Sequence, residues 1–377
     1  MELDGLRAIS VLFVVGAHTA KYSHYFNLSE SCGALWGLLA QTGVQIFFII
    51  SGFIITKLLI DEHRRTGRVS LKGFYIRRFF RIIPAFWTYS ISILLLAALG
   101  IVVLKEGAVP QVTGFIVSSL FLSDIFYPSW FWGHTWSLSV EEQFYVCFPL
   151  IFALIYKSRH KAVIMPIFLI LVYISAFFAT TFIDAFRSGL YLVYSHFDWN
   201  RYLGGSLFFS YQYIATGVSM AIFWKTASSV LGRLPLLFYI LVIANILSLP
   251  FWNPPEAVAL LRWYTYPILL ACLVGWVMVK PAYFGLLRWP VIQFIGASSY
   301  SVYLWQQLFT GDPTRYGPIP LSNPLISLFL LFLCATLSYH FVERKFIALG
   351  RRLSRAKSPE PAKVPLQAPQ PDVVTRS

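Results

Sequence analysis

Residues 43–60 read GVQIFFIISGFIITKLLI, an apolar run whose only charged member, Lys57, lies near its end. A helix that crosses a bilayer needs about 20 predominantly apolar residues. The run is followed directly by the basic segment 61–83, which carries seven Lys and Arg residues. An apolar span that ends in a basic segment is typical of a membrane helix leaving the bilayer on its cytoplasmic side.

The same pattern recurs along the 377 residues, of which 57% are hydrophobic and 12% charged, with a mean hydropathy of +0.66. Soluble domains carry about 25% charged residues. The sequence therefore predicts an all-α, polytopic transmembrane helix bundle with about ten spans. A shorter apolar stretch, 111–124, is interpreted as a re-entrant or interfacial segment. We place the spans at about 5–22, 43–60, 84–104, 137–157, 161–182, 204–224, 234–250, 258–279, 296–310 and 324–341.

The positive charge is sorted by membrane side. A net charge of +14 in a soluble protein would suggest nucleic acid as a partner. Here, 24 of the 30 Lys and Arg residues fall at the two ends of the chain and in every second gap between spans, and 6 fall in the other gaps. Because cytoplasmic segments of membrane proteins are enriched in Lys and Arg, we expect both termini in the cytoplasm, membrane lipids as neighbours and no nucleic acid.

The chain divides into a membrane domain and a tail. Residues 1–346 hold all the predicted spans. Residues 347–377 are rich in Pro, Lys and Ser and lack an apolar pattern, and we expect a disordered cytoplasmic tail there. The first span is expected to be retained and not cleaved as a signal peptide. The four cysteines form no CxxC pair, so we expect no metal site and no disulfide framework.

The first span, LDGLRAISVLFVVGAH over residues 3–18, contains Arg7 and His18. Ionisable groups inside a span are costly and are functional candidates. The two residues are separated by about three helical turns, so they share one face and lie roughly 16 Å apart along the axis. The alternative roles are a snorkelling anchor for Arg7 and a packed core histidine for His18.

The fourth span begins TWSLSVEEQFYV over residues 135–146. It enters from the outside, which places Glu141 about one turn below the outer surface, at the depth expected for His18. A histidine and a carboxylate at one level suit general acid–base chemistry, with the carboxylate orienting the ring. Glu142 points about 100° away and is not the expected partner. The alternative is a structural ion pair.

The basic segment ends FYIRRFFRIIPAFW, residues 74–87. Residues 70–83 are predicted to form an amphipathic surface helix leading to a span that starts at Pro84. Its three arginines are expected to form one cationic face suited to phosphate oxygens, and the alternative is contact with anionic lipid head groups. These arginines are Arg77, Arg78 and Arg81.

Six segments, in this order, resemble the acyltransferase-3 family of bacterial integral membrane proteins, the sugar and peptidoglycan O-acetylases. They are DGLRAISVLFVVGAH, GVQIFFIISGF, FYIRRFFRIIPAFW, TWSLSVEEQFY, GASSYSVYLWQQ and SYHFVERKF, within residues 3–346. The resemblance implies a ten-helix enzyme of the bacterial inner membrane, an O-acetyltransferase. Such an enzyme takes an acyl group, usually acetyl, from cytoplasmic acyl-CoA to a hydroxyl of an extracytoplasmic glycan such as lipopolysaccharide O-antigen or exopolysaccharide. Acyl-CoA is then a donor substrate, and no bound cofactor is expected.

The resemblance also assigns roles to residues. The catalytic residues of the family fall on Arg7, His18 and Glu141, and its donor-binding arginines fall on Arg77, Arg78 and Arg81. His18 is expected to act as general base on the acceptor hydroxyl or as a transient acyl carrier. The chain departs from the family pattern at Gln45, where an acidic residue is common, and at Gln306, where histidine often follows the tryptophan.

The rival function is a polytopic transporter of a sugar, lipid or proton. Intramembrane His18 and Glu141 would suit a proton relay as well as catalysis. The sequence shows no convincing internal repeat, and its arginine cluster lies on one side only. Both observations weigh against a transporter built from duplicated halves.

Overall fold

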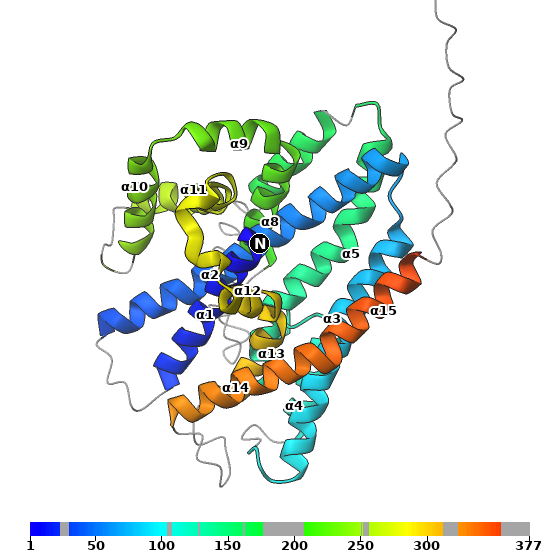
Figure 1. The fold of residues 1–377 in the computed structure, drawn as a ribbon, viewed down its shortest axis with the longest axis vertical. Coiled ribbons are helices and arrows are strands. Elements are labelled where there is room, and N and C mark those ends of the chain that lie inside the picture. Colours follow the sequence, from blue (N-terminus) through cyan, green and yellow to red (C-terminus); the bar gives the residue numbers. More distant parts are fainter. Residues whose placement is uncertain are drawn as a thin grey trace, which may run out of the picture.

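The computed structural model describes residues 1–22, 30–103, 108–126, 129–160, 163–175, 207–249, 251, 256–311 and 323–355. Within these ranges every regular element is a helix (Figure 1), so the predicted all-α class is confirmed. Five helical segments are long and apolar enough to cross a membrane: Glu2–Ala20, Cys32–Thr66, Leu71–Ala98, Trp130–Lys157 and Pro324–Ser354.

Two bent helix pairs raise this number to seven if each pair is one span. Helix α8 (Leu207–Ile222) meets α9 (Trp224–Arg233) at 93°, and α11 (Glu256–Val279) meets the 3₁₀ helix η2 (Pro281–Arg288) at 85°. A shorter apolar helix, α10 (Leu236–Leu247), lies between these pairs in sequence. The predicted span 161–182 is described only over Val163–Ser175. The total of ten spans and the side of each terminus therefore stay predictions.

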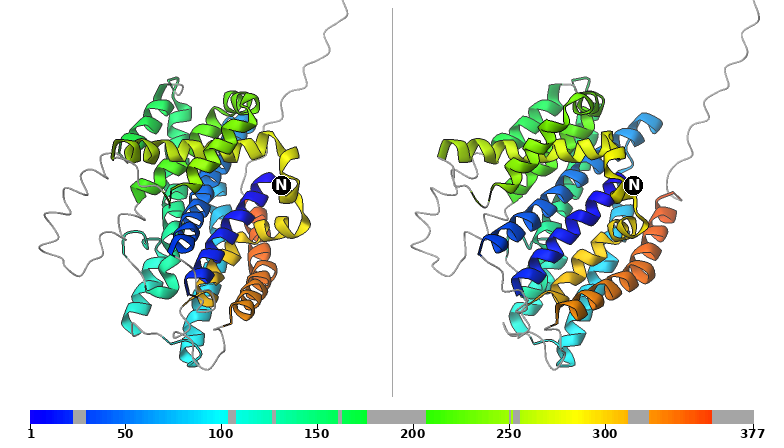
Figure 2. Two further views of the ribbon diagram at one scale, coloured as in Figure 1. Left: turned by 90° about the vertical axis from the view of Figure 1, so that its left-hand side faces the viewer. Right: turned by 60° about the vertical axis from the view of Figure 1, so that its left-hand side comes forward.

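Helices α1 (Glu2–Tyr22) and α2 (Glu30–Thr66) lie side by side at the centre of the bundle (Figure 2). They run antiparallel with a defined register. A Cβ atom added to Gly43 would lie 2.5 Å from the carbonyl oxygen of Ser10, and one added to Gly16 would lie 2.5 Å from the ring of Trp36. The two contacts show which residues of α1 and α2 share a depth.

Helix α2 approaches α8 backbone to backbone. A Cβ atom added to Gly52 would lie 2.2 Å from the Ile214 carbonyl oxygen, and one added to Gly217 would lie 2.1 Å from the Ile49 carbonyl oxygen. Small residues permit such close approach between membrane helices. These reciprocal glycines lock the position of α2 against α8.

Helix α3 (Leu71–Ala98) joins two elements that the sequence analysis separated. It begins after Ser70, whose side chain accepts a hydrogen bond from the Gly73 amide, and it continues through Pro84. The prediction that a span starts at Pro84 is therefore wrong. Membrane helices tolerate an internal proline because nearby side chains and helices satisfy the disturbed backbone. One turn further along the helix, the Thr88 hydroxyl donates to the Pro84 carbonyl at 2.8 Å.

The last helices form one rod beside α3 (Figure 1), built from α14 (Pro324–Ser338), the π-helical turn η4 (Tyr339–Glu343) and α15 (Arg344–Arg355). The ring of Phe346 stacks on Phe80 of α3 with centroids 6.2 Å apart. The rod continues past residue 346 into the predicted tail as far as Arg355. Residues 356–377 of that tail lie outside the described part of the chain.

The segment before α5 (Trp136–Lys157) is the 3₁₀ helix η1 (Trp130–Thr135), which is pinned to α3. The Tyr89 hydroxyl donates to the Phe131 carbonyl at 2.7 Å, and the Trp132 indole donates to the Ser90 hydroxyl at 3.0 Å. Phe131 and Trp132, two of the three aromatic residues of η1, are fully buried. Helix η1 is thus a buried continuation of α5 at its N-terminal end and not an exposed loop.

The apolar stretch 111–124 holds most of α4 (Ala108–Ser119), a helix too short to cross a bilayer. Beyond it, the side chain of Asp124 accepts a hydrogen bond from the Gln143 amide of α5 at 2.9 Å. Burial raises the pKa of the Asp124 carboxyl above its usual value. This contact ties the loop to the outer part of α5.

Replacing Gly52 with Ala tests the α2–α8 contact. The added methyl group meets a backbone oxygen, which cannot rotate away as a side chain can, so we expect a loss of about 1–3 kcal/mol in the free energy of unfolding. The measurement is thermal denaturation in one detergent. The control is Gly37→Ala, because Gly37 lies in the same helix with no atom within 4 Å of the added Cβ. Equal melting temperatures for the two variants would contradict the close packing.

Candidate active site

A cavity of about 250 Å³ lies between α1, α2, α3, α5 and α13 (Ser299–Phe309). Its apolar wall comes mainly from Val, Ile and Phe side chains of α2, together with Ile82 and Leu138. Ligand sites in proteins are commonly mostly apolar cavities with a few placed polar groups. The charged residues that line this one are Asp4, Arg7, Arg78, Arg81, Glu141 and Glu142.

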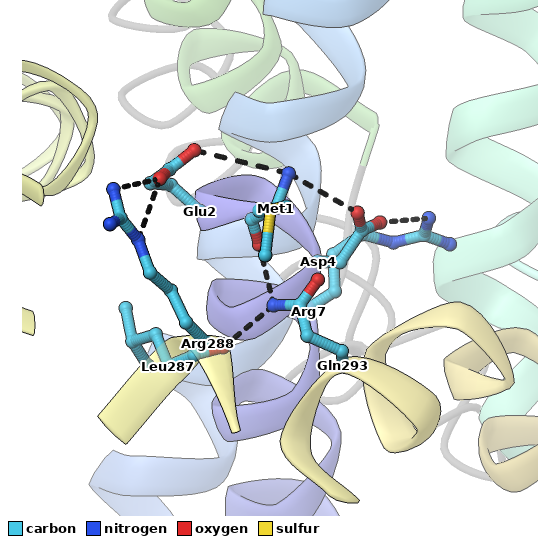
Figure 3. A network of polar contacts seen from close by, with 7 residues as sticks. All are labelled: Met1, Glu2, Asp4, Arg7, Leu287, Arg288 and Gln293. Atoms are coloured by element: carbon cyan, nitrogen blue, oxygen red, sulfur yellow. Dashed lines mark hydrogen bonds and ion pairs between the residues drawn. The ribbon is translucent and has the colours of Figure 1, made fainter. Parts of the chain in front are cut away.

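Arg7 is held at the N-terminal end of α1 by a small polar network (Figure 3). Its guanidinium lies 3.9 Å from the carboxylate of Asp4, which also pairs with the amino group of Met1 at 3.6 Å. On the other side, Glu2 pairs with Arg288 at 2.8 Å. The ion pair with Asp4 is the one that Arg7 makes among the described residues, and the Arg7 side chain also lines the cavity.

Arg78 and Arg81 line the cavity three residues apart on α3. The Arg78 guanidinium stacks on the Tyr145 ring at 3.4 Å from the centroid. Neither arginine lies within ion-pair distance of a carboxylate in the described part of the chain. Arg77 differs, because it is 41% exposed, pairs with Glu62 at 3.6 Å and is not part of the cavity wall. The structure thus brings together two of the three predicted arginines.

Glu141 is the centre of a compact hydrogen-bonded group. The Ser51 hydroxyl donates to one carboxylate oxygen at 2.9 Å, and the Tyr145 hydroxyl lies 2.9 Å from the other and 2.8 Å from the Ser51 hydroxyl. The positive charge of Arg78 acts on the same carboxylate. Charge-assisted hydrogen bonds of this kind are the stronger ones in proteins, so the Glu141 carboxylate has a fixed position in the wall.

The structure does not bring His18 and Glu141 together, contrary to the predicted pairing. Ser51, the partner of Glu141, lies eight residues beyond Gly43 in one direction, and His18 lies eight residues beyond Ser10 in the other. At 1.5 Å per residue the two levels are about 24 Å apart. The error has a clear cause: η1 extends the helix of Glu141 outward, so this residue lies deeper than a count from Trp136 suggests.

His134 of η1 is a buried residue that the sequence analysis missed, and its charge and that of His18 act on each other. The His134 ring is buried and lies between two tyrosines, 5.6 Å from Tyr89 and 5.5 Å from Tyr303 between centroids. The only sequence signal was a histidine three residues before the predicted span 137–157, in a segment that reads as an aromatic loop.

Glu343 is a second residue that the sequence analysis missed. It ends the π-helical turn η4, is 2% exposed and accepts a hydrogen bond from Ser301 at 2.9 Å. Its charge acts on Arg81 and Arg7. Single π-helical turns occur often at functional sites. The negative charge of Glu343 therefore offsets part of the positive charge of Arg81 and Arg7.

The two positions at which the chain departs from the family pattern are both buried. Neither polar atom of the Gln306 amide, nor the Gln45 amide oxygen, has a hydrogen-bond partner among the described residues. Buried polar groups are usually paired. Two such amides in the wall of one bundle mark a region that suits water or a polar ligand.

Along the bundle these groups form a polar column. The cavity holds the guanidinium groups, the Glu141 group and the paired hydroxyls of Ser137 and Tyr303 (2.6 Å), and the Tyr303 ring packs against His134. Within the described ranges no three His, Cys, Asp or Glu residues are arranged to hold a metal ion. The column suits an elongated anionic ligand at one end and proton transfer at the other.

Comparison with known proteins gives a family match over nearly the whole chain. A family model described as an acyltransferase domain matches residues 2–342. A putative O-acetyltransferase of Staphylococcus aureus (strain COL) is 28% identical over 382 residues, which cover 91% of this chain and 56% of the relative. The putative peptidoglycan O-acetyltransferase YrhL of Bacillus subtilis is 27% identical, covering 93% of this chain and 55% of the relative.

The O-acetyltransferase OatA of Staphylococcus aureus (strain NCTC 8325) is similar to the same degree. It is 27% identical over 366 residues, covering 90% of this chain and 56% of the relative. The chain therefore spans about half the length of the curated relatives that it matches. No solved structure matches the chain.

The Glu141 group can be tested through stability. In a Glu141→Gln variant one hydroxyl faces an amide NH₂ group in place of an oxygen, so we expect a loss of about 1–3 kcal/mol in the free energy of unfolding. Glu142→Gln is the matched control, because Glu142 also lines the cavity but makes no hydrogen bond with a described residue. Thermal denaturation of both proteins checks this, and an equal loss in the two variants would contradict the assigned contacts.

Proposed function

Since this chain belongs to the acyltransferase-3 family, we propose that it is a multi-pass O-acyltransferase of the bacterial inner membrane. It transfers an acyl group, in the simplest case acetyl, from cytoplasmic acyl-CoA to a hydroxyl of an extracytoplasmic glycan. Acyl-CoA is the donor substrate, and the proposal needs no bound cofactor.

The observation that carries this proposal is the pair of cavity arginines, neither of which lies within ion-pair distance of a carboxylate among the described residues. Burying guanidinium groups without such close partners is costly, and Arg78 and Arg81 bear this cost in the wall of one cavity. Arginine forks bind phosphate oxygens in two-point contacts. Arg7 lines the same cavity and adds a third positive charge. Coenzyme A supplies the phosphates that these groups are suited to bind.

The remainder of the cavity suits the acyl-bearing arm of the coenzyme. Its apolar wall accepts the methylene groups, while the hydroxyls of Ser51, Tyr145 and Tyr303 offer hydrogen bonds to amide and thioester groups. Glu141 fixes two of these hydroxyls and the stacked Arg78. In this proposal Glu141 therefore positions the donor and does not orient His18.

Transfer takes place beyond the far end of the cavity. His18 acts as the general base that removes the proton of the acceptor hydroxyl while its oxygen attacks the thioester carbon. The new C–O bond forms and the C–S bond breaks, with the electron pair going to the coenzyme sulfur. Arg7, at the opposite end of the same helix, acts on the donor and does not contact the reacting hydroxyl.

The names of the relatives support an order in which glycan acceptors are tested. One relative is named a putative peptidoglycan O-acetyltransferase, so peptidoglycan fragments are the first acceptors to test. Lipopolysaccharide O-antigen and exopolysaccharide are tested in parallel. Each acceptor needs an accessible hydroxyl on the outer side of the membrane, where the first helix carries His18.

A transporter remains the competing function, because it too would use buried histidines and carboxylates. The cavity arginines separate the two functions. A transporter of a sugar, lipid or proton has no need to bind coenzyme A, whereas the acyltransferase binds it before any transfer takes place. Failure of the purified protein to bind coenzyme A would favour the transporter.

Donor binding is predicted to depend on Arg78 and Arg81 and not on Arg77. Each Arg→Gln change in the cavity removes a charged hydrogen bond, worth about 1.5–3 kcal/mol, so the Kd for acetyl-CoA should rise about tenfold or more. The measurement is equilibrium binding of radiolabelled acetyl-CoA to protein in nanodiscs. Arg77→Gln is the control and should leave the Kd unchanged. Three equal effects would instead indicate a general attraction between the basic helix and anions.

Transfer is predicted to depend on His18. Loss of a general base lowers rates by about 10²–10⁴-fold, so a His18→Ala variant should bind acetyl-CoA normally but transfer little label. The assay follows the acetyl group of [¹⁴C]acetyl-CoA into peptidoglycan fragments, lipopolysaccharide and exopolysaccharide. Unaltered transfer by His18→Ala would eliminate this residue as the base.

A further inference from the structure

Ser299, at the start of α13, has a buried hydroxyl in an unusual state. The side chain is fully buried, and its oxygen has no hydrogen-bond partner among the described residues. Serine hydroxyls in helices often donate to the carbonyl one turn back, as Ser298 does to Phe294 at 2.8 Å. Leaving a buried hydroxyl unpaired is costly unless water or a ligand pairs with it.

Ser299 lies in the wall of the cavity described above. Tyr300 and Tyr303 of the same helix also line this cavity. Because Tyr303 follows Ser299 by four residues, the two share one face of α13. The unpaired hydroxyl therefore belongs to the wall of the space proposed for the donor.

The N-terminal end of α13 lies at the same wall, since Ser299 is the first of its 11 residues. The first N–H groups of a helix have no partner within it, and the helix dipole places partial positive charge there. The side chain of the capping residue, Ser298, makes no hydrogen bond to these groups. Helix N-termini bind phosphate and other anions through such N–H groups.

Arg81 is held beside this helix end. The Tyr300 hydroxyl donates to the backbone carbonyl of Ile82 at 3.0 Å, which ties the first turn of α13 to the residue after Arg81. Arg81 lines the same cavity. Its guanidinium therefore adds charged N–H donors to this part of the wall, in a fork that suits phosphate oxygens.

Arg7 approaches the same place from α1. A Cβ atom added to Gly296 would overlap the backbone carbonyl of Asp4, so α1 meets the chain here just before α13 begins. Ser299 and Arg7 each lie three residues beyond this contact, so both are within about 5 Å of its level. Arg7 lines the cavity as well. A hydroxyl, a helix N-terminus and two guanidinium groups thus border one part of the cavity.

The other side of this helix end carries a carboxylate. The Ser301 hydroxyl donates to Glu343 at 2.9 Å. Residues two apart in a helix point about 200° apart, so Ser301 and Ser299 lie on opposite sides of α13. Glu343 does not line the cavity. The helix end therefore has a carboxylate of the protein on one side and an open position on the other.

On the basis of the proposed function, we propose that Ser299 and the first turn of α13 bind the phosphate of acyl-CoA that carries the pantetheine arm. The Ser299 hydroxyl and the N–H groups of α13 donate to the phosphate oxygens, and Arg7 and Arg81 offset the negative charge. No bond forms or breaks in this step. The site sets the depth of the donor in the bundle.

The depth of this site suits the proposed transfer. Arg7 and His18 lie roughly 16 Å apart along α1. A phosphate held at the level of Arg7 lets an extended pantetheine arm carry the thioester toward the His18 end of the bundle. The same arm passes the hydroxyl of Tyr303, which lines the cavity one turn beyond Ser299.

The test removes the hydroxyl and the phosphate separately. Full-length wild type and Ser299→Ala are compared in nanodiscs with acetyl-CoA, 3′-dephospho-acetyl-CoA, S-acetyl-4′-phosphopantetheine and S-acetylpantetheine, of which only the last lacks the phosphate in question. Radiolabelled acetyl-CoA gives the first Kd by equilibrium binding, and competition with it gives the other three. Ser299→Cys is a second variant, because a thiol is a weak hydrogen-bond donor.

Ser298→Ala is the matched control. Ser298 lies at the same helix end, but its hydroxyl donates to the Phe294 carbonyl and the residue does not line the cavity. Thermal denaturation identifies the folded variants. Because the Ser299 hydroxyl bonds to no described residue, its removal should not lower the melting temperature, whereas a hydroxyl with a purely structural role would.

We expect Ser299→Ala to raise the Kd of the three phosphate-bearing ligands by one common factor of about ten or more, and to leave that of S-acetylpantetheine unchanged. Ser299→Cys should act in the same direction, and Ser298→Ala should change none of the four. An unchanged Kd for acetyl-CoA, an equal rise for S-acetylpantetheine, or a rise confined to acetyl-CoA would overturn the assignment while leaving the proposed function intact. Failure of wild type to bind acetyl-CoA would overturn the proposed function, and this inference with it.

Discussion

The close approach of α2 to its neighbours fixes the depth of the polar groups in this bundle. At Gly43 the backbone of α2 meets that of α1, and at Gly52 it meets that of α8. Because backbone atoms cannot move aside as long side chains do, these contacts allow little sliding between the helices. The register they impose sets Ser51 beside Glu141 at one level and leaves His18 many ångströms farther out. The polar column of the candidate site is a consequence of this register.

Periodicity and charge revealed much of this arrangement in advance. The apolar runs predicted the all-helical bundle that the structure has, whereas the functional face of α1 predicted from the spacing of Arg7 and His18 stays a prediction. Periodicity gives the face of a residue but not the point at which its helix begins. The segment containing His134 is aromatic and reads as a loop, so η1 was not recognised. The depth of Glu141 was consequently misjudged, and the buried His134 was overlooked.

The three neighbouring arginines of α3 show a second limit of prediction from sequence alone. Arg77, Arg78 and Arg81 are indistinguishable by composition, and successive residues of a helix point about 100° apart. Which pair faces inward depends on packing partners far away in sequence. Here Tyr145 of α5 stacks on Arg78, and Glu343 near the end of the chain acts on Arg81, while Arg77 pairs with the nearby Glu62. Tertiary contacts therefore selected two arginines for the cavity from three equivalent candidates.

The π-helical turn η4 changes which face of the C-terminal rod points toward the rest of the bundle. A π turn holds more residues than an α turn, and one extra residue rotates everything after it by about 100°. Upstream, α14 presents Leu and Phe side chains outward, as a helix facing lipid does. Downstream, α15 turns Phe346 and Gly350 toward α3 and its basic side chains away. The C-terminal rod therefore presents a lipid-facing surface over α14 and packs against α3, the helix of Arg78 and Arg81, over α15. The buried carboxylate of Glu343 lies between these two parts.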